Sequence, residues 1–87
     1  MAHEQLQRAS EELRAAAEAA GGEIRERLER QADQFAKLAE SGADHGRLAR
    51  HENALREIEA EASEGVSDHV AAAKEAITAY RETIEGV

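Results

Sequence analysis

One short segment of this chain combines residue types that could bind an anion. It runs from His45 to His51 (HGRLARH) and contains two histidines and two arginines but no acidic residue. Guanidinium groups present a fork of N–H donors that fits carboxylate and phosphate oxygens, and the free amides at the start of a helix favour the same ligands. The candidate anion- or partner-binding residues are therefore His45, Arg47, Arg50 and His51.

The same residues also have a structural interpretation, which is the commoner outcome for such side chains. Arginines among acidic helices usually pair with neighbouring glutamates. A histidine on an apolar helix face, which is where the spacing places His51, is usually a hydrogen-bonded core residue. The sequence favours this structural interpretation and leaves the binding interpretation as the alternative.

No other reactive constellation is recognisable. The four histidines lack the three- or four-residue spacing with which a helix presents metal ligands together, and the chain has no cysteine. The serines lie in helix-end or surface contexts, and the glycines do not form a phosphate-binding loop. We expect no catalytic residue, no metal site and no cofactor, and hence a protein that is not an enzyme.

The charge balance excludes several partners. Nineteen acidic residues against eleven basic ones give a net charge of -8, which opposes binding to nucleic acid phosphates. No apolar run approaches the roughly 20 residues of a membrane span, and the first residues do not resemble a signal peptide. We expect a cytoplasmic chain that binds neither nucleic acid nor membranes.

Apolar residues recur at helical spacing between the glycines, and proline is absent. Asp44 and Ser67 are placed to cap helices at their start, and Gly42 is placed to end one. The predicted fold is all-α: an antiparallel up-and-down bundle of four short helices in a single domain over residues 1–87. The predicted helices cover about residues 3–20, 23–40, 45–62 and 68–85.

The glycine pair Gly21-Gly22 leaves one alternative open. Two glycines inside a helix cost about 2 kcal/mol relative to alanines, which favours a turn at this point. The apolar spacing nevertheless continues across the pair without a phase break. The alternative is therefore one long N-terminal helix followed by a helical hairpin.

The core is expected to be thin, because Leu, Ile, Val and Phe together number only 14 of 87 residues. Small subunits of this kind often gain stability by self-association, so we expect a homodimer. The acid-rich, lysine-poor composition is typical of proteins from saturated-salt cytoplasms, where salt screens the repulsion between like charges. We expect folding to depend on salt.

The stretch DHGRLARHENALREI, from Asp44 to Ile58, resembles a family of short, acidic, all-helical haloarchaeal proteins of unknown function. The resemblance extends more loosely to the amphipathic N-terminal half and to the last ten residues. It implies a halophilic cytoplasm and an all-helical fold. It implies no activity, so no catalytic residue can be carried over from it.

Two functional hypotheses follow. The first is a halophilic helical protein that acts by helix-mediated self-association or by contact with an unidentified protein partner. The second is a small regulatory module that binds phosphate or carboxylate through the His45–His51 segment.

Overall fold

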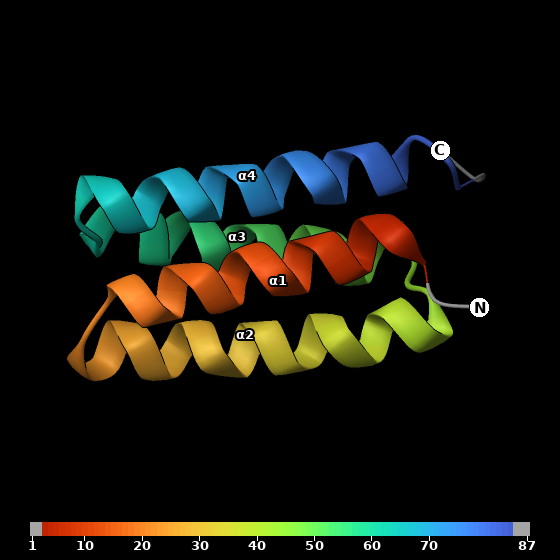
Figure 1. Cartoon of the computed structure of the whole chain (residues 1–87). Helices are drawn as coiled ribbons and strands as arrows, with labels where there is room; N and C mark the ends of the chain where they lie inside the picture. The colour runs from red at the N-terminus through yellow and green to blue at the C-terminus, as the bar shows by residue number, and fades with distance from the viewer. Residues whose placement is uncertain (1–2, 85–87) are drawn as a thin grey trace.

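A computed structural model describes residues 3–84, which form four α-helices and no strand. The helices run alternately up and down (Figure 1), as predicted for an all-α bundle. The start of α1, the end of α2, the start of α3 and the end of α4 consequently meet at one end of the molecule. The helices are α1 (Glu4–Ala19), α2 (Gly22–Ser41), α3 (His45–Glu61) and α4 (Glu64–Arg81).

The glycine pair separates α1 from α2. Ala20 and Gly21 are both extended, and Gly22 has a φ of 60°, a value that glycine adopts without steric penalty. The alternative of one long N-terminal helix is therefore wrong. The turn predicted at this position is confirmed.

Gly42 ends α2 in a backbone conformation that favours glycine. Its φ is 78° and its ψ is 170°, a region in which other residues are strained by about 1–3 kcal/mol. Its N–H donates to the Leu38 carbonyl oxygen at 2.6 Å. Asp44 then begins α3, because its carboxylate accepts a hydrogen bond from the Arg47 N–H at 2.7 Å. The predicted ends of both helices are confirmed.

The start of α4 differs from the prediction. The helix begins at Glu64, four residues before the expected position. Gly65 lies in the first turn, where N–H groups have no partner within the helix, and Glu64 suits the positive end of the helix dipole. The Ser67 hydroxyl does not cap α4 and instead donates to the Glu59 carbonyl oxygen at 3.1 Å. This serine therefore links the end of α3 to α4.

The core is built around α1. Three alanines of α1 are buried, and this helix approaches both α2 and α4 closely along its length. The Ser10 hydroxyl donates to the Ala32 carbonyl oxygen of α2 at 2.8 Å, which requires the two backbones to lie near each other. Small side chains permit this, because the distance between packed helices depends on the side chains at the contact.

By contrast, α3 lies farther from its neighbours. It buries three large apolar side chains but no alanine, and its close backbone approaches to α2 and α4 are few. Long polar side chains span the extra distance on both sides. Examples are the Arg27–Glu61 ion pair to α2 and the Lys74–Glu59 ion pair to α4.

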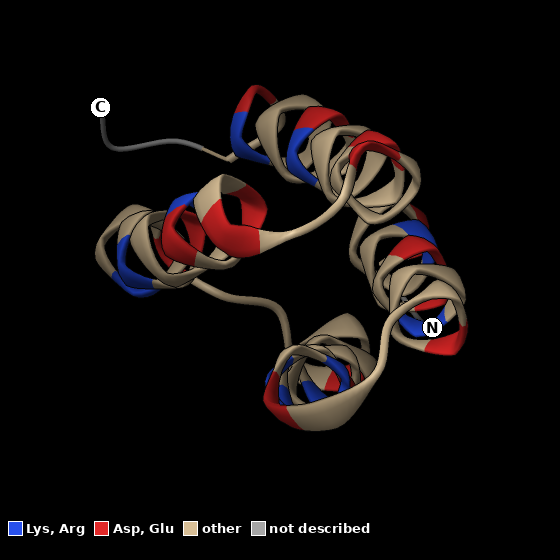
Figure 2. Cartoon of the chain, turned by 90° about the vertical axis from the view of Figure 1, so that its left-hand side faces the viewer, with Lys and Arg blue, Asp and Glu red and all other residues tan. Residues whose placement is uncertain are grey.

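The large apolar residues lie inside this single chain. All described Leu, Val and Phe side chains are buried, while Ile24 and Ile84 are partly buried against the core. Charged residues of both signs lie around the four helices when the bundle is viewed end-on (Figure 2). α4 ends at Arg81, before the predicted end near residue 85, and Val87 lies outside the described residues. The apolar residues of the core are Leu6, Ala9, Leu13, Ala16, Ala17, Leu28, Ala32, Phe35, Leu38, Ala39, Leu48, Leu55, Ile58, Val66, Val70, Ala73, Ala76, Ile77 and Tyr80.

Two glycine substitutions should change stability in opposite directions. Gly42→Ala should lower the free energy of unfolding by about 1–3 kcal/mol, because alanine is strained at this φ and ψ. Its Cβ would also lie 3.0 Å from His3 Nε2 and 3.1 Å from the Tyr80 hydroxyl. Gly65→Ala should raise the free energy of unfolding by up to about 1 kcal/mol. The reason is that Gly65 is helical and an added Cβ meets open space. Chemical denaturation followed by circular dichroism measures both changes, and equal effects would contradict this account of Gly42.

Candidate functional site

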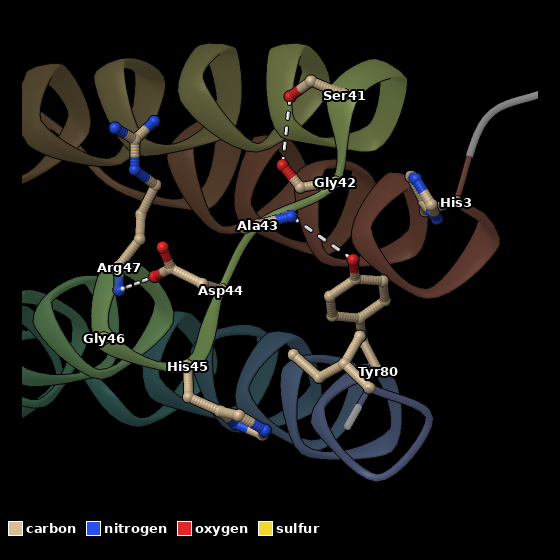
Figure 3. Close-up of a pocket in the computed structure, with 10 residues that line it drawn as sticks. His3, Ser41, Gly42, Ala43, Asp44, His45, Gly46, Arg47 and Tyr80 are labelled. Carbon is tan, nitrogen blue, oxygen red and sulfur yellow. Dashed lines mark hydrogen bonds between the residues drawn. The ribbon is translucent and has the colours of Figure 1, made fainter. Parts of the chain in front are cut away.

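The His45–His51 segment forms the first two turns of α3, at the end of the bundle where both described chain ends meet. Beside it lies an open pocket of about 730 Å³ (Figure 3). The pocket is bounded by the α2–α3 connection, the residue preceding α1 and the end of α4. Its lining residues are His3, Ser41, Gly42, Ala43, Asp44, His45, Gly46, Arg47, Tyr80 and Ile84.

Tyr80 fixes the α2–α3 connection that forms one wall of this pocket. Its hydroxyl oxygen accepts a hydrogen bond from the Ala43 N–H at 3.3 Å. The His3 ring stands edge-on to the Tyr80 ring, with 5.5 Å between the ring centroids. Both side chains lie next to Gly42, which has no side chain to exclude them. The pocket wall therefore combines residues from α4, from the residue before α1 and from the connection.

Hydrogen-bond donors and cationic groups outnumber acidic groups among the side chains that line the pocket. Arg47 is exposed, and its guanidinium forms no ion pair within 4 Å among residues 3–84. His3 and the Tyr80 hydroxyl contribute further polar hydrogens. The one carboxylate is that of Asp44, and one of its oxygens is already bonded to the Arg47 N–H. The arrangement suits a ligand that accepts hydrogen bonds.

His45 belongs to a polar cluster between α3 and α4. The Arg81 Nε–H donates to His45 Nδ1 at 3.0 Å, and a second N–H of Arg81 donates to Glu52 at 2.6 Å. The Glu52 side chain is only 10% exposed, so the guanidinium of Arg81 compensates a nearly buried carboxylate. His45 Nε2 is enclosed and has no hydrogen-bond partner among the described residues.

His51 faces α2 and does not reach the pocket. Its Nδ1 lies 2.8 Å from Gln31 Oε1, and its ring packs edge-on against Phe35 at 4.9 Å. Burial lowers the pKa of His51, and the positive charges of Arg47 and Arg50 lower it further. A neutral imidazole bonded to α2 fits the structural interpretation of this residue.

The four candidate residues are therefore divided by the fold. His45 and Arg47 line the pocket, whereas Arg50 is exposed on α3 outside it and His51 lies against α2. The spacing argument missed His3 and Tyr80, which lie far from this segment in sequence. An up-and-down topology brings residues near 3, 42 and 80 to one end, which is the signal that could have identified them.

Two further polar residues differ from the sequence analysis. Ser10 is buried between α1 and α2, not placed at a surface or helix end. His69, which has no metal-ligand spacing in the sequence, lies with Nδ1 3.0 Å from Glu12 Oε1 of α1. Within residues 3–84, no group of three or more His, Asp or Glu side chains is arranged to hold a metal ion.

Comparison with known proteins identifies the family. The model of a family of unknown function (DUF7553) matches residues 1–83. The chain belongs to this family. The match covers the candidate segment and all four helices, and DUF7553 has no assigned activity that could be transferred to the pocket. No curated protein and no solved structure matches the chain. None of the described helices of this DUF7553 member is both long and apolar enough to cross a bilayer.

The lowered pKa of His51 predicts how stability responds to acid. Unfolded His51 takes up its proton near pH 6.5, whereas the folded residue takes it up only at a lower pH. As the pH falls from above 6.5 towards the folded pKa, the unfolded state binds more protons, so the free energy of unfolding decreases. His51→Gln should remove this part of the decrease. Denaturation of both proteins between pH 8 and pH 5 measures the difference, and parallel profiles would exclude the assignment.

Proposed function

We propose that this DUF7553 member is a non-enzymatic binding module that holds a small carboxylate or phosphate anion at the end of its bundle. The observation that carries this proposal is the convergence of donors from three parts of the chain on one pocket. Arg47 comes from α3, Tyr80 from α4 and His3 from the residue before α1. The acidic, lysine-poor surface favours a high-salt cytoplasm as the setting.

Arg47 has the clearest part in this proposal. It lines the pocket, its guanidinium is without a carboxylate partner among residues 3–84, and its planar fork fits two oxygens of one anion. The first amides of α3 add a positive electrostatic contribution to the same place. Asp44 opposes anion binding through its charge, although one of its oxygens is engaged with the Arg47 N–H.

The test is titration with sulfate, phosphate and acetate at constant ionic strength, followed by calorimetry and by the melting temperature. A ligand that binds only the folded state raises the melting temperature. Arg47→Gln should weaken sulfate binding by roughly 10- to 100-fold, the equivalent of one charged hydrogen bond. Asp44→Asn should strengthen it, because asparagine still caps the helix but carries no charge.

Arg50→Gln is the matched control, since Arg50 is exposed on the same helix but does not line the pocket. It should leave sulfate affinity within about twofold of the parent protein. If both arginine variants lose affinity equally, the anion responds to the general charge of α3 and not to the pocket. If the parent protein binds none of the three anions, the proposed function is wrong.

A second candidate function is helix-mediated association, either with another copy or with a different protein. Arg50 on the outer side of α3 is exposed and forms no ion pair in the described part of the chain. Glu75 of α4 and Glu82, which follows the helix, are likewise exposed and without a basic partner there. Because the large apolar residues are already inside the bundle, a homodimer of this protein would rely on such polar groups.

Light scattering over a series of potassium chloride concentrations tests this second candidate. Surface ion pairs weaken as salt rises, so a two-chain mass is expected at the lowest salt in which the protein is folded. Arg50→Glu should shift the mass towards one chain. Arg8→Glu is the control, because Arg8 is exposed on α1 and makes no ion pair among residues 3–84. A one-chain mass at every salt concentration would exclude the homodimer.

A further inference from the structure

We infer that the outer face of α3 is the surface through which two copies of this chain associate, with their two α3 helices antiparallel. This inference rests on the second candidate function, helix-mediated association, and names its surface and its orientation. Arg50 and Glu57 carry the inference. Both side chains are exposed, and neither forms an ion pair within 4 Å among residues 3–84.

Arg50 and Glu57 lie on the same side of α3. They are seven residues apart, which is close to two helical turns and places them about 10.5 Å apart along the helix axis. The outer face of α3 therefore presents one positive and one negative group two turns apart. The residues that α3 buries lie on the other side of the helix and are Leu48, Glu52, Leu55 and Ile58.

This arrangement of charges is self-complementary when the two helices are antiparallel. In an isologous contact the same patch of both copies meets, so residue i of one copy contacts residue j of the other and j contacts i. If two α3 helices cross between residues 53 and 54, Arg50 of each copy lies opposite Glu57 of the other, and two equal ion pairs form. A parallel pair would place Arg50 against Arg50 and Glu57 against Glu57, and such like-charge contacts are costly.

The residues at this crossing point are uncharged and permit a close approach. Asn53 is exposed and Ala54 is partly exposed. The distance between packed helices depends on the side chains at the contact, and neither of these side chains is long. The Asn53 Oδ1 already accepts a hydrogen bond from Arg56 Nη1 at 3.0 Å. The centre of the contact therefore brings no like charges together.

A local match of charges is needed because the chains repel each other as a whole. Each copy carries a net charge of -8, which opposes association at long range. The large apolar residues are inside the bundle, so the contact is polar. Salt weakens both the repulsion and the exposed ion pairs. We therefore expect a weak dimer whose specificity comes from the Arg50–Glu57 pairs.

Charge reversal tests the pairs, with sedimentation equilibrium at the lowest potassium chloride concentration in which the parent protein is folded. Arg50→Glu and Glu57→Arg should each raise the dissociation constant of the dimer roughly tenfold or more, because each turns two attractive pairs into two repulsive ones. The variant with both substitutions restores two pairs in reversed order and should return to within about threefold of the parent protein. An equimolar mixture of the two single variants should also give a two-chain mass, since both pairs are then opposite in sign.

Cysteine cross-linking tests the orientation, since the chain has no cysteine of its own. Asn53→Cys should form a disulfide between copies on oxidation, because the crossing point brings the two copies of residue 53 together. Ala60→Cys is the matched control, since Ala60 is also exposed on α3. Antiparallel helices place its two copies about 20 Å apart along the axis, which is too far for a disulfide.

The outcomes separate the inference from the function on which it rests. A one-chain mass of the parent protein at every concentration would overturn both. A two-chain mass that both single variants retain, or that the double variant does not restore, would overturn this surface and keep self-association. Equal cross-linking of the two cysteine variants would indicate a parallel pair and would overturn the orientation. If a charge-reversal variant does not fold, the cysteine variants, which retain Arg50 and Glu57, decide the matter. Sulfate binding is measured independently, because neither Arg50 nor Glu57 lines the pocket.

Discussion

The close packing of α1 against α2 and α4 is the constraint on which the other features depend. Buried alanines and Ser10 permit these backbones to approach, and the Ser10–Ala32 bond fixes the approach of α1 to α2. Because α1 fills the space between its two neighbours, α3 completes the bundle from the opposite side at a greater distance. The consequence is a molecule with one closely packed side and one side joined through long polar side chains.

That asymmetry explains the chemistry around α3. A helix that buries only three large apolar side chains depends on polar contacts for much of its attachment. His51 is bonded towards α2, whereas His45 and Glu52 contact Arg81 of α4. Two of the four residues that suggest a binding site in the sequence, His45 and His51, therefore also attach the helix that carries them.

Much of the fold could be predicted because the relevant signals are local. The turn at Gly21, the end of α2 at Gly42 and the Asp44 cap each depend on a few neighbouring residues. The start of α4 could not be predicted in this way. Ser67 is a residue type that often caps helices, but in the structure its hydroxyl bonds to the Glu59 carbonyl oxygen of α3. The contact with α3, and not the local sequence, determined which of these two roles Ser67 has.

The site was predictable only in part for the same reason. His45 and Arg47 lie at a helix start, and helix starts can be identified from sequence. His3 and Tyr80 join them only after the topology has brought distant segments together, and Glu52 is nearly buried only because Arg81 lies opposite it. The apolar spacing placed His51 on the inner face of α3, whereas the structure leaves it partly exposed and buries its neighbour Glu52.

The Ser10 hydroxyl has a broader consequence for the molecule. A hydroxyl that donates to one specific carbonyl oxygen of a neighbouring helix fixes the rotation of α1 about its own axis, which alanine packing alone would leave adjustable. If α1 slid by one residue, this donor would be buried without an acceptor. The contact between α1 and α2, in which small side chains let the backbones approach, thus gains a preferred alignment from one buried hydroxyl.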